Sequence, residues 1–165
     1  MKTLLRTLAF VADSQDGTIL ARAIEIANLL ANEAGAEDER VITCAMLRML
    51  PHAPSPKDVE RLFGREVRDI LDSLGGEADA DAGTISRLSR RARLVLLAEN
   101  ICRLRRLVAD PRQLWPLEKR QAVFDNARCI TESLHGIHPQ LERLFEEEFK
   151  LRPRLHAETP GMACA

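Results

Sequence analysis

One arginine, Arg48, stands inside an apolar run that extends from Val41 to Leu50. The run is apolar on nearly every helical face, which predicts a helix enclosed by other elements. A guanidinium group keeps its charge, so Arg48 must either extend along its stem to water or bind a carboxylate. Position 48 is therefore the first candidate for a functional site, and from the sequence both explanations stay open.

The residue types that most often bind metals or act as nucleophiles lack a characteristic spacing here. The four cysteines are Cys44, Cys102, Cys129 and Cys164. No two of them have metal-ligand or redox spacing, so we expect buried free thiols in a reducing compartment. The four histidines are His52, His135, His138 and His156. No carboxylate lies at helical spacing with two of these histidines, so we expect no metal site from them.

The strongest local charge is an arginine-rich stretch. Residues 87–112 hold eight arginines against the acids Glu99 and Asp110. The favoured interpretation is a solvated helix face that pairs with acidic residues elsewhere, such as 77–81 or 146–148. A pocket for a phosphorylated ligand or an acidic protein partner is the alternative.

Composition limits the classes of protein that fit the chain. Its 165 residues, 45% of them hydrophobic, are enough for one domain with an ordinary core. With 24 basic and 25 acidic residues the net charge is −1, which gives no general attraction to nucleic acid or to an anionic membrane. No apolar segment approaches the roughly 18 residues of a membrane span, and no signal peptide is recognisable. We expect a cytoplasmic protein with neither a nucleic-acid nor a membrane partner.

Apolar residues recur at three- and four-residue spacing along most of the chain, which predicts helices, and no strand pattern is present. The end signals are clear at several places. Gly35 is a natural helix stop, and Ser55 followed by Pro56 and Asp58 is typical of a helix start. The predicted helical segments are 2–13, 18–33, 41–50, 55–63, 65–74, 84–108, 117–135 and 138–151.

These segments predict an all-α bundle of about eight helices in a single domain over residues 1–151. The segment 84–108 is long enough to be either one helix or two. Residues 75–83, which include the acidic stretch 77–81, are expected to form a solvated loop. Residues 152–165 show no periodicity and are expected to be a disordered tail.

Several segments in this order carry a resemblance to a known family. They are Glu33 to Gly35, Val41 to Pro54, Phe63-Gly-Arg-Glu-Val67, Val95 to Arg105, Leu117 to Arg120 and Gly136 to Phe149. Together they resemble the small HD-domain hydrolases related to the RelA and SpoT enzymes, which remove the 3′-pyrophosphate of the alarmone ppGpp. The resemblance covers about residues 8 to 152 and implies an all-α HD-domain fold.

The resemblance also implies where a metal-dependent site would lie, and there the sequence departs from the family. In the family a His-Pro step, a His-Asp pair and a later Asp bind one divalent metal, and a Glu-Asp pair helps to activate the water. The corresponding positions here are Arg22-Ala23, Arg48-Met49, Glu99 and His52-Ala53, and an asparagine of the later helix becomes Arg103. Only Glu99 is a carboxylate, and arginines beside a methionine repel a dication.

We therefore expect no catalytic residue, no metal and no other cofactor. The expected remnant of the site is a ligand pocket formed by Arg22, Arg48, His52, Glu99 and Arg103. Within this pocket we predict that Arg48 and Glu99 form a buried or half-buried ion pair, with Arg22 near enough to share the carboxylate.

Three functions remain open from the sequence. The favoured one is a catalytically inactive HD-domain protein, a pseudoenzyme that binds or regulates through a nucleotide, another phosphorylated small molecule or a protein partner. The first alternative is a metal-dependent phosphohydrolase that acts on ppGpp or another nucleotide through an altered site. The second alternative is a purely structural protein-interaction domain.

Overall fold

The computed structural model describes residues 2–75, 82–109 and 115–153. These residues form nine α-helices and one π-helix without any strand, which confirms the all-α prediction. The α-helices are α1 (Lys2–Ala12), α2 (Gly17–Asn28), α3 (Glu39–Leu47), α4 (Pro56–Phe63), α5 (Arg65–Leu74), α6 (Ala82–Arg87), α7 (Arg90–Ala109), α8 (Leu117–Glu132) and α9 (Pro139–Phe149). The π-helix η1 (Leu29–Glu33) directly follows α2.

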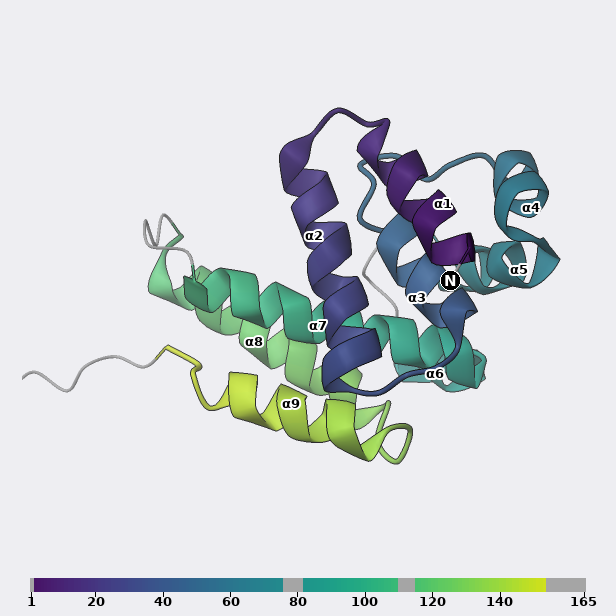
Figure 1. Cartoon of the computed structure of the whole chain (residues 1–165). Helices are drawn as coiled ribbons and strands as arrows, with labels where there is room; N and C mark the ends of the chain where they lie inside the picture. The colour runs from purple at the N-terminus through teal and green to yellow at the C-terminus, as the bar shows by residue number, and fades with distance from the viewer. Residues whose placement is uncertain (1, 76–81, 110–114, 154–165) are drawn as a thin grey trace, which may run out of the picture.

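Helix α7 is the longest helix and runs across the middle of the molecule (Figure 1). In this view α1, α3, α4 and α5 lie mostly above it, α2 crosses in front of it, and α8 and α9 lie below it. Helix α7 contacts α2, α3, α5, α8 and α9, and α3 contacts α1, α2, α5 and α7. Helices α3 and α7 also contact each other, so these two elements can bring distant side chains together.

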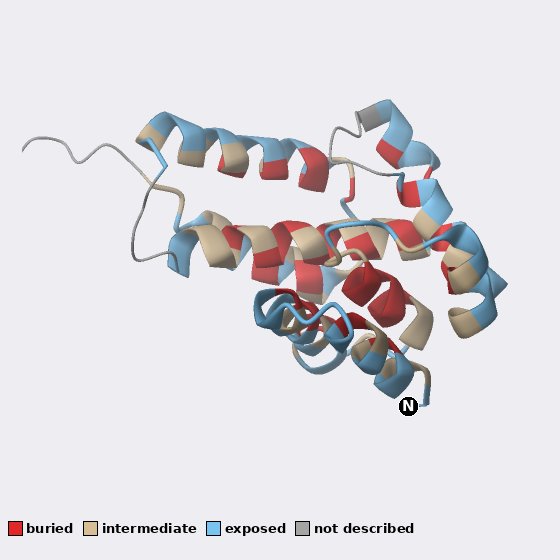
Figure 2. Cartoon of the chain, turned by 90° about the horizontal axis from the view of Figure 1, so that it is seen from above, coloured by how far each residue is buried: buried red, intermediate tan, exposed pale blue. Residues whose placement is uncertain are grey.

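Helix α3 is the enclosed helix that the apolar run predicted. Every residue from Val41 to Leu47 is buried. Figure 2 shows that buried residues gather where the helices face one another, whereas the outer faces are exposed. Since burying one large apolar side chain stabilises a fold by about 1.5–3 kcal/mol, this helix is a main source of stability.

Side-chain caps determine where several helices begin. The Ser55 hydroxyl accepts a hydrogen bond from the backbone N–H of Asp58 at 3.1 Å, as its place before Pro56 predicted. The Ser89 hydroxyl accepts from the backbone N–H of Ala92 at 3.2 Å. This second cap starts α7 and divides the segment 84–108, so the two-helix alternative is the correct one.

The predicted helix 18–33 changes its type near its end. After Asn28 the chain continues as η1, in which the Ala34 N–H donates to the carbonyl of Leu29 at 2.9 Å. The wider turn accompanies a contact of Glu33 with α7, where Arg105 Nη2 lies 2.8 Å from Glu33 Oε2. Arg105 Nε also lies 2.9 Å from Glu148 Oε1 on α9, so one arginine joins three helical elements.

Two of the predicted segments cannot be compared in full. The acidic stretch 77–81 and the tail residues 154–165 lie outside the described residues. Arg152 is described, and its Nη2 lies 2.7 Å from Asp125 Oδ2 on α8. Contacts with the bundle thus continue past the expected domain end at residue 151. Within the described residues, no helix has the length and apolar character that a membrane span requires.

Candidate functional site

The end of α3 places Arg48 at the border between the core and the surface. The helix ends at Leu47, and Arg48 is its C-cap with a backbone N–H that donates to the carbonyl of Cys44 at 3.1 Å. The next residues form a tight turn, in which the Leu50 N–H donates to the Leu47 carbonyl at 3.2 Å. Pro51 has no N–H to continue the helix, and Arg48 is only partly buried, whereas Val41 to Leu47 are buried.

The Arg48 guanidinium forms a two-point ion pair with Glu99 of α7. Its Nε donates to Glu99 Oε1, and its Nη2 donates to Oε2 at 3.3 Å. Only 17% of the Arg48 side chain and 11% of the Glu99 side chain are exposed. The predicted half-buried ion pair is therefore confirmed, and the alternative of an arginine that merely extends to water is wrong.

Arg48 also makes a hydrogen bond that its sequence context does not predict. Its Nη1 donates to the backbone carbonyl of Gly75 at 3.1 Å. Gly75 follows the last residue of α5 and has a φ of 63°, a backbone conformation that residues other than glycine rarely adopt. Residues 48 and 75 share no pattern that a sequence could reveal, because a carbonyl group carries no side-chain signal.

The other residues of the expected remnant pocket do not join this ion pair. Arg22 is exposed on α2, and it makes no hydrogen bond or ion pair with any described residue, so the prediction that it shares the Glu99 carboxylate is wrong. Both Glu99 oxygens are already bound by Arg48. His52 is exposed in the turn after α3, and Arg103 lies half-buried on α7 one helical turn beyond Glu99.

The side chains at this site do not fit a divalent metal. Among the ligand positions that the resemblance implies, Glu99 is the only carboxylate, and it already binds the Arg48 guanidinium. No cluster of three or more His, Cys, Asp or Glu side chains suited to a metal occurs in the described parts of the chain. A hard dication needs several oxygen or imidazole ligands, so this donor set disagrees with the metal that the resemblance implies.

Three arginines of the stretch 87–112 pair with acids outside α7. Arg91 Nε lies 2.7 Å from Asp38 Oδ2, and Arg106 Nη1 lies 3.2 Å from Glu25 Oε2. Together with Arg105, they support the favoured interpretation of a helix face that pairs with acidic residues. Arg103, like Arg87 and Arg93, has no hydrogen bond or ion pair to another described residue. Its guanidinium thus keeps its donors for water or for a ligand.

A pocket of about 450 Å³ opens beside the ion pair, between the end of α3 and the helices α4 and α5. Its wall combines apolar residues, such as Leu50, Pro54 and Leu71, with the charged residues Arg68 and Asp72. Arg48 and Gly75 form part of the same wall. The pocket therefore gives solvent and small solutes access to the side of the guanidinium.

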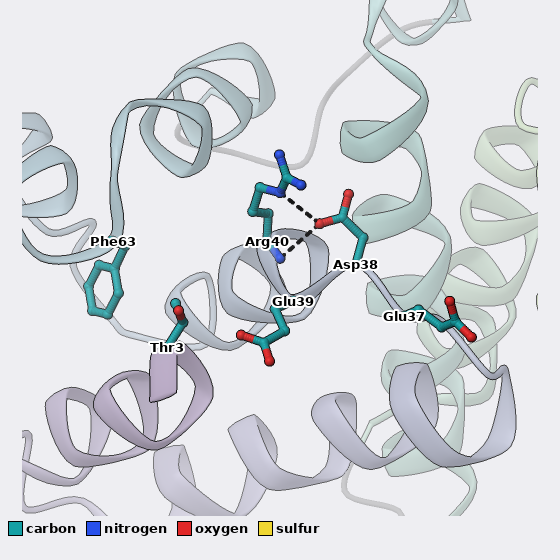
Figure 3. A pocket seen from close by; sticks show the side chains of 6 residues that line it. All are labelled: Thr3, Glu37, Asp38, Glu39, Arg40 and Phe63. Carbon is teal, nitrogen blue, oxygen red and sulfur yellow. Dashed lines mark hydrogen bonds and ion pairs between the residues drawn. The ribbon is translucent and has the colours of Figure 1, made fainter. Parts of the chain in front are cut away.

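A second pocket, of about 530 Å³, lies at the opposite end of α3 (Figure 3). Its acidic side contains Asp38, which caps α3 and accepts from the Arg40 backbone N–H at 3.1 Å and from Arg40 Nε at 3.0 Å. Burial raises the pKa of the Asp38 carboxyl, but the hydrogen bonds from Arg91 and Arg40 outweigh this effect and hold the pKa below its usual value. Asp38 is thus engaged in holding the start of α3.

Two buried thiols, those of Cys44 and Cys102, have low reactivity. Burial raises the pKa of Cys44 to about 12 and that of Cys102 to about 12. Cys129 is exposed on α8, which corrects the expectation that it is buried, whereas Cys164 lies outside the described residues. The apolar spacing around Cys129 does form helix α8, but Cys129 itself lies on the outer face of that helix.

Comparison with known proteins places the fold. No protein-family model matches the chain. It is 28% identical over 150 residues to the Drosophila melanogaster protein named guanosine-3′,5′-bis(diphosphate) 3′-pyrophosphohydrolase MESH1, covering 85% of this chain and 84% of the relative. The Homo sapiens protein of the same name is 26% identical over 155 residues, again covering 85% and 84%.

A solved structure agrees with these relatives. It is described as a metazoan ortholog of SpoT that hydrolyzes ppGpp and plays a role in starvation responses. It matches with a TM-score of 0.79 at 23% identity, covering 92% of this chain and 96% of that chain. These similarities confirm the expected resemblance and the all-α, HD-domain-like fold.

Proposed function

We propose that this chain is an HD-fold domain that has lost metal-dependent hydrolysis and acts as a binding or regulatory module. The observation that carries the proposal is the ion pair in which Arg48 binds both carboxylate oxygens of Glu99. The relatives are named as hydrolases of a guanosine bis(diphosphate), and the resemblance assigns their metal to this position. Here a guanidinium group takes the carboxylate that a metal would need.

A guanidinium group cannot replace a metal in the chemistry of hydrolysis. A divalent metal binds a water molecule and lowers its pKa, so that hydroxide forms near neutral pH. A guanidinium has only N–H donors and offers no coordination position to a water oxygen. His52, at a position where the resemblance implies an acidic residue, is exposed and has no acidic partner among the described residues. The proposal therefore assigns neither metal nor base to this site.

Binding of a phosphorylated nucleotide is compatible with the same residues. Arg22 and Arg103 have no acidic partner among the described residues, so their donors are available. The planar fork of a guanidinium matches two oxygens of a phosphate group, and such hydrogen bonds are stronger than neutral ones. We infer that a ligand related to ppGpp would contact these two arginines.

Hydrolysis and binding can be measured on the same purified protein. We expect no turnover of ppGpp with added Mn²⁺ and no stoichiometric bound metal by elemental analysis. We expect ppGpp to raise the melting temperature, since a ligand at 100 times its Kd adds about 2.7 kcal/mol to the free energy of unfolding. Turnover that grows with bound metal would overturn the proposal in favour of a phosphohydrolase with an altered site.

Matched variants identify where the ligand binds. Arg22→Ala and Arg103→Ala should each weaken the ppGpp-dependent rise in melting temperature. Arg61→Ala is the control, because Arg61 is an exposed arginine of α4 whose only ion pair in the described structure is with Asp58 at 3.0 Å. If neither ppGpp nor other nucleotides stabilise the protein, the structural protein-interaction domain becomes the better account.

A further inference from the structure

The C-terminal ends of two helices meet at the Arg48 guanidinium. Helix α3 ends at Leu47, and Arg48 is its cap, while α5 ends at Leu74 and leaves the Gly75 carbonyl pointing at Arg48 Nη1, 3.1 Å away. Neither helix has a basic residue in its last turn. The C-terminus of a helix carries a partial charge of about −0.5, so a cation placed beside it is stabilising.

Glu99 adds a full negative charge to the same point. It projects from the middle of α7, and only 11% of its side chain is exposed. A carboxylate shielded from water is costly unless a cation and hydrogen bonds compensate it. Glu99 and the two helix ends therefore form a junction of negative charge, which we call the α3–α5–α7 junction.

All three nitrogens of Arg48 are used at the junction. Nε and Nη2 donate to the two Glu99 oxygens, and Nη1 donates to the Gly75 carbonyl. The acceptors thus match the planar, forked arrangement of guanidinium N–H groups rather than the single point charge of an ammonium.

We infer that the α3–α5–α7 junction is a guanidinium-binding site whose occupant is the chain's own Arg48 side chain. Truncating this side chain leaves the acceptors in place and creates a site for a free small guanidinium. The inference does not depend on the proposed function, because the junction holds a cation whatever the chain binds or hydrolyses.

The pocket of about 450 Å³ gives such a ligand a route to the junction. Arg48 and Gly75 both line this pocket, so removal of the Arg48 side chain extends it to the Glu99 carboxylate. Methylguanidinium consists of the planar guanidinium group and one methyl group, and it is smaller than the side chain that it would replace.

The test is chemical rescue of the full chain carrying Arg48→Ala. We expect a lower melting temperature for the variant and a saturable rise when methylguanidinium chloride is added. At about five times its Kd the ligand should raise the melting temperature by roughly 2–4 °C for a chain of this size. The wild-type protein, whose site is filled, should show no saturable rise.

Three comparisons decide the outcome. Methylammonium chloride at the same ionic strength should rescue far less, and Arg48→Ala/Glu99→Gln should lose the rescue. Arg61→Ala should show no rescue, since it removes an exposed arginine that has no buried carboxylate to leave behind. Equal rescue by methylammonium, stronger rescue by Mn²⁺, or rescue of the double variant would overturn a site specific for guanidinium.

If Arg48→Ala is recovered unfolded, the same inference is tested by refolding. Dilution from urea into methylguanidinium should restore the helical circular dichroism signal, and dilution into methylammonium should not. Failure of methylguanidinium to restore any helical signal, while Arg48→Met/Glu99→Leu folds unaided, would overturn the inference, because the junction would then accept only a covalently attached occupant.

Discussion

Arg48 and Glu99 are 51 residues apart in the chain, yet two nitrogens of the arginine bind the two oxygens of the glutamate. Neither residue has another charged partner among those described. The pair joins the end of α3 to the middle of α7, and the Gly75 carbonyl extends it to α5. An ion pair thus connects helices at the position where the resemblance assigns a metal.

Removing one member of this pair should cost more than removing both. Arg48→Met or Glu99→Gln each leaves a shielded group without its partner, and we expect a loss of about 3 kcal/mol, at the lower end of the range for buried pairs because some exposure remains. The double variant should lose less than the sum of the single losses. Urea unfolding of all four proteins measures the coupling, and simple additivity would show that the pair contributes little.

The assignment of the former metal position predicts that ligands can be restored. Arg22→His, Arg48→His, Met49→Asp and Glu99→Asp together remove both arginines and supply four potential ligands. We expect measurable Mn²⁺ or Zn²⁺ affinity by isothermal titration, whereas the wild-type protein should show none. A folded quadruple variant that binds no metal would mean that the correspondence between these positions and the family's metal ligands is wrong. Arg22 would be the first position to reassign, because it is exposed on α2.

Gly75→Ala should destabilise the fold through its backbone. The φ of 63° with a ψ of −177° lies in a region that essentially only glycine adopts, which costs an L-residue about 1–3 kcal/mol, although the added methyl group would meet no atom within 4 Å. Gly17→Ala is the matched control, since its surroundings are equally open and it begins α2 without a positive φ. Urea unfolding should show a loss for the first variant and none for the second.

The two buried thiols should resist alkylation in the native protein. With a pKa of about 12, Cys44 and Cys102 are ionised at roughly one part in ten thousand at pH 8, and burial also blocks access. Exposed Cys129 should react with iodoacetamide under the same conditions. Peptide mapping by mass spectrometry reports each site, and urea should make all of them reactive. Rapid native labelling of Cys44 would contradict the enclosed position of α3.

Acid should weaken the contact between η1 and α7. The hydrogen bond from Arg105 lowers the pKa of Glu33 below the usual 4.5, against the opposing effect of burial. Because the folded pKa is the lower one, the stabilisation is fully present above pH 4.5 and is lost as the pH falls through the folded pKa.

Arg105→Met should therefore be less stable than the wild type at neutral pH and lose less stability on acidification. Denaturant unfolding at several pH values between about 6 and 3 measures both effects. Glu147→Gln is the control, because Glu147 is exposed and its nearest cation, Arg143, lies 3.9 Å away. Parallel pH profiles for Arg105→Met and the wild type would exclude a contribution from this ion pair.

The sequence by itself determined most of the helices, and it showed that the charged side chain of Arg48 needs either water or a carboxylate partner. The apolar run 41–47 had to be enclosed, and Ser55 had to cap α4, because both signals act over a few residues. Arg48 could not lose its charge, and the resemblance placed Glu99 as the retained carboxylate. These two constraints together predict the ion pair.

Tertiary structure decided the contacts that depend on how helices end and which way they face. The Gly75 carbonyl reaches Arg48 only because α5 ends beside α3, and Arg22 misses Glu99 because its position on α2 is exposed. Cys129 likewise lies on the outer face of α8, although its neighbours are apolar. A backbone acceptor leaves no mark on residue types, and apolar spacing predicts which broad face of a helix is buried but not the exact rotation that packing against the other helices selects.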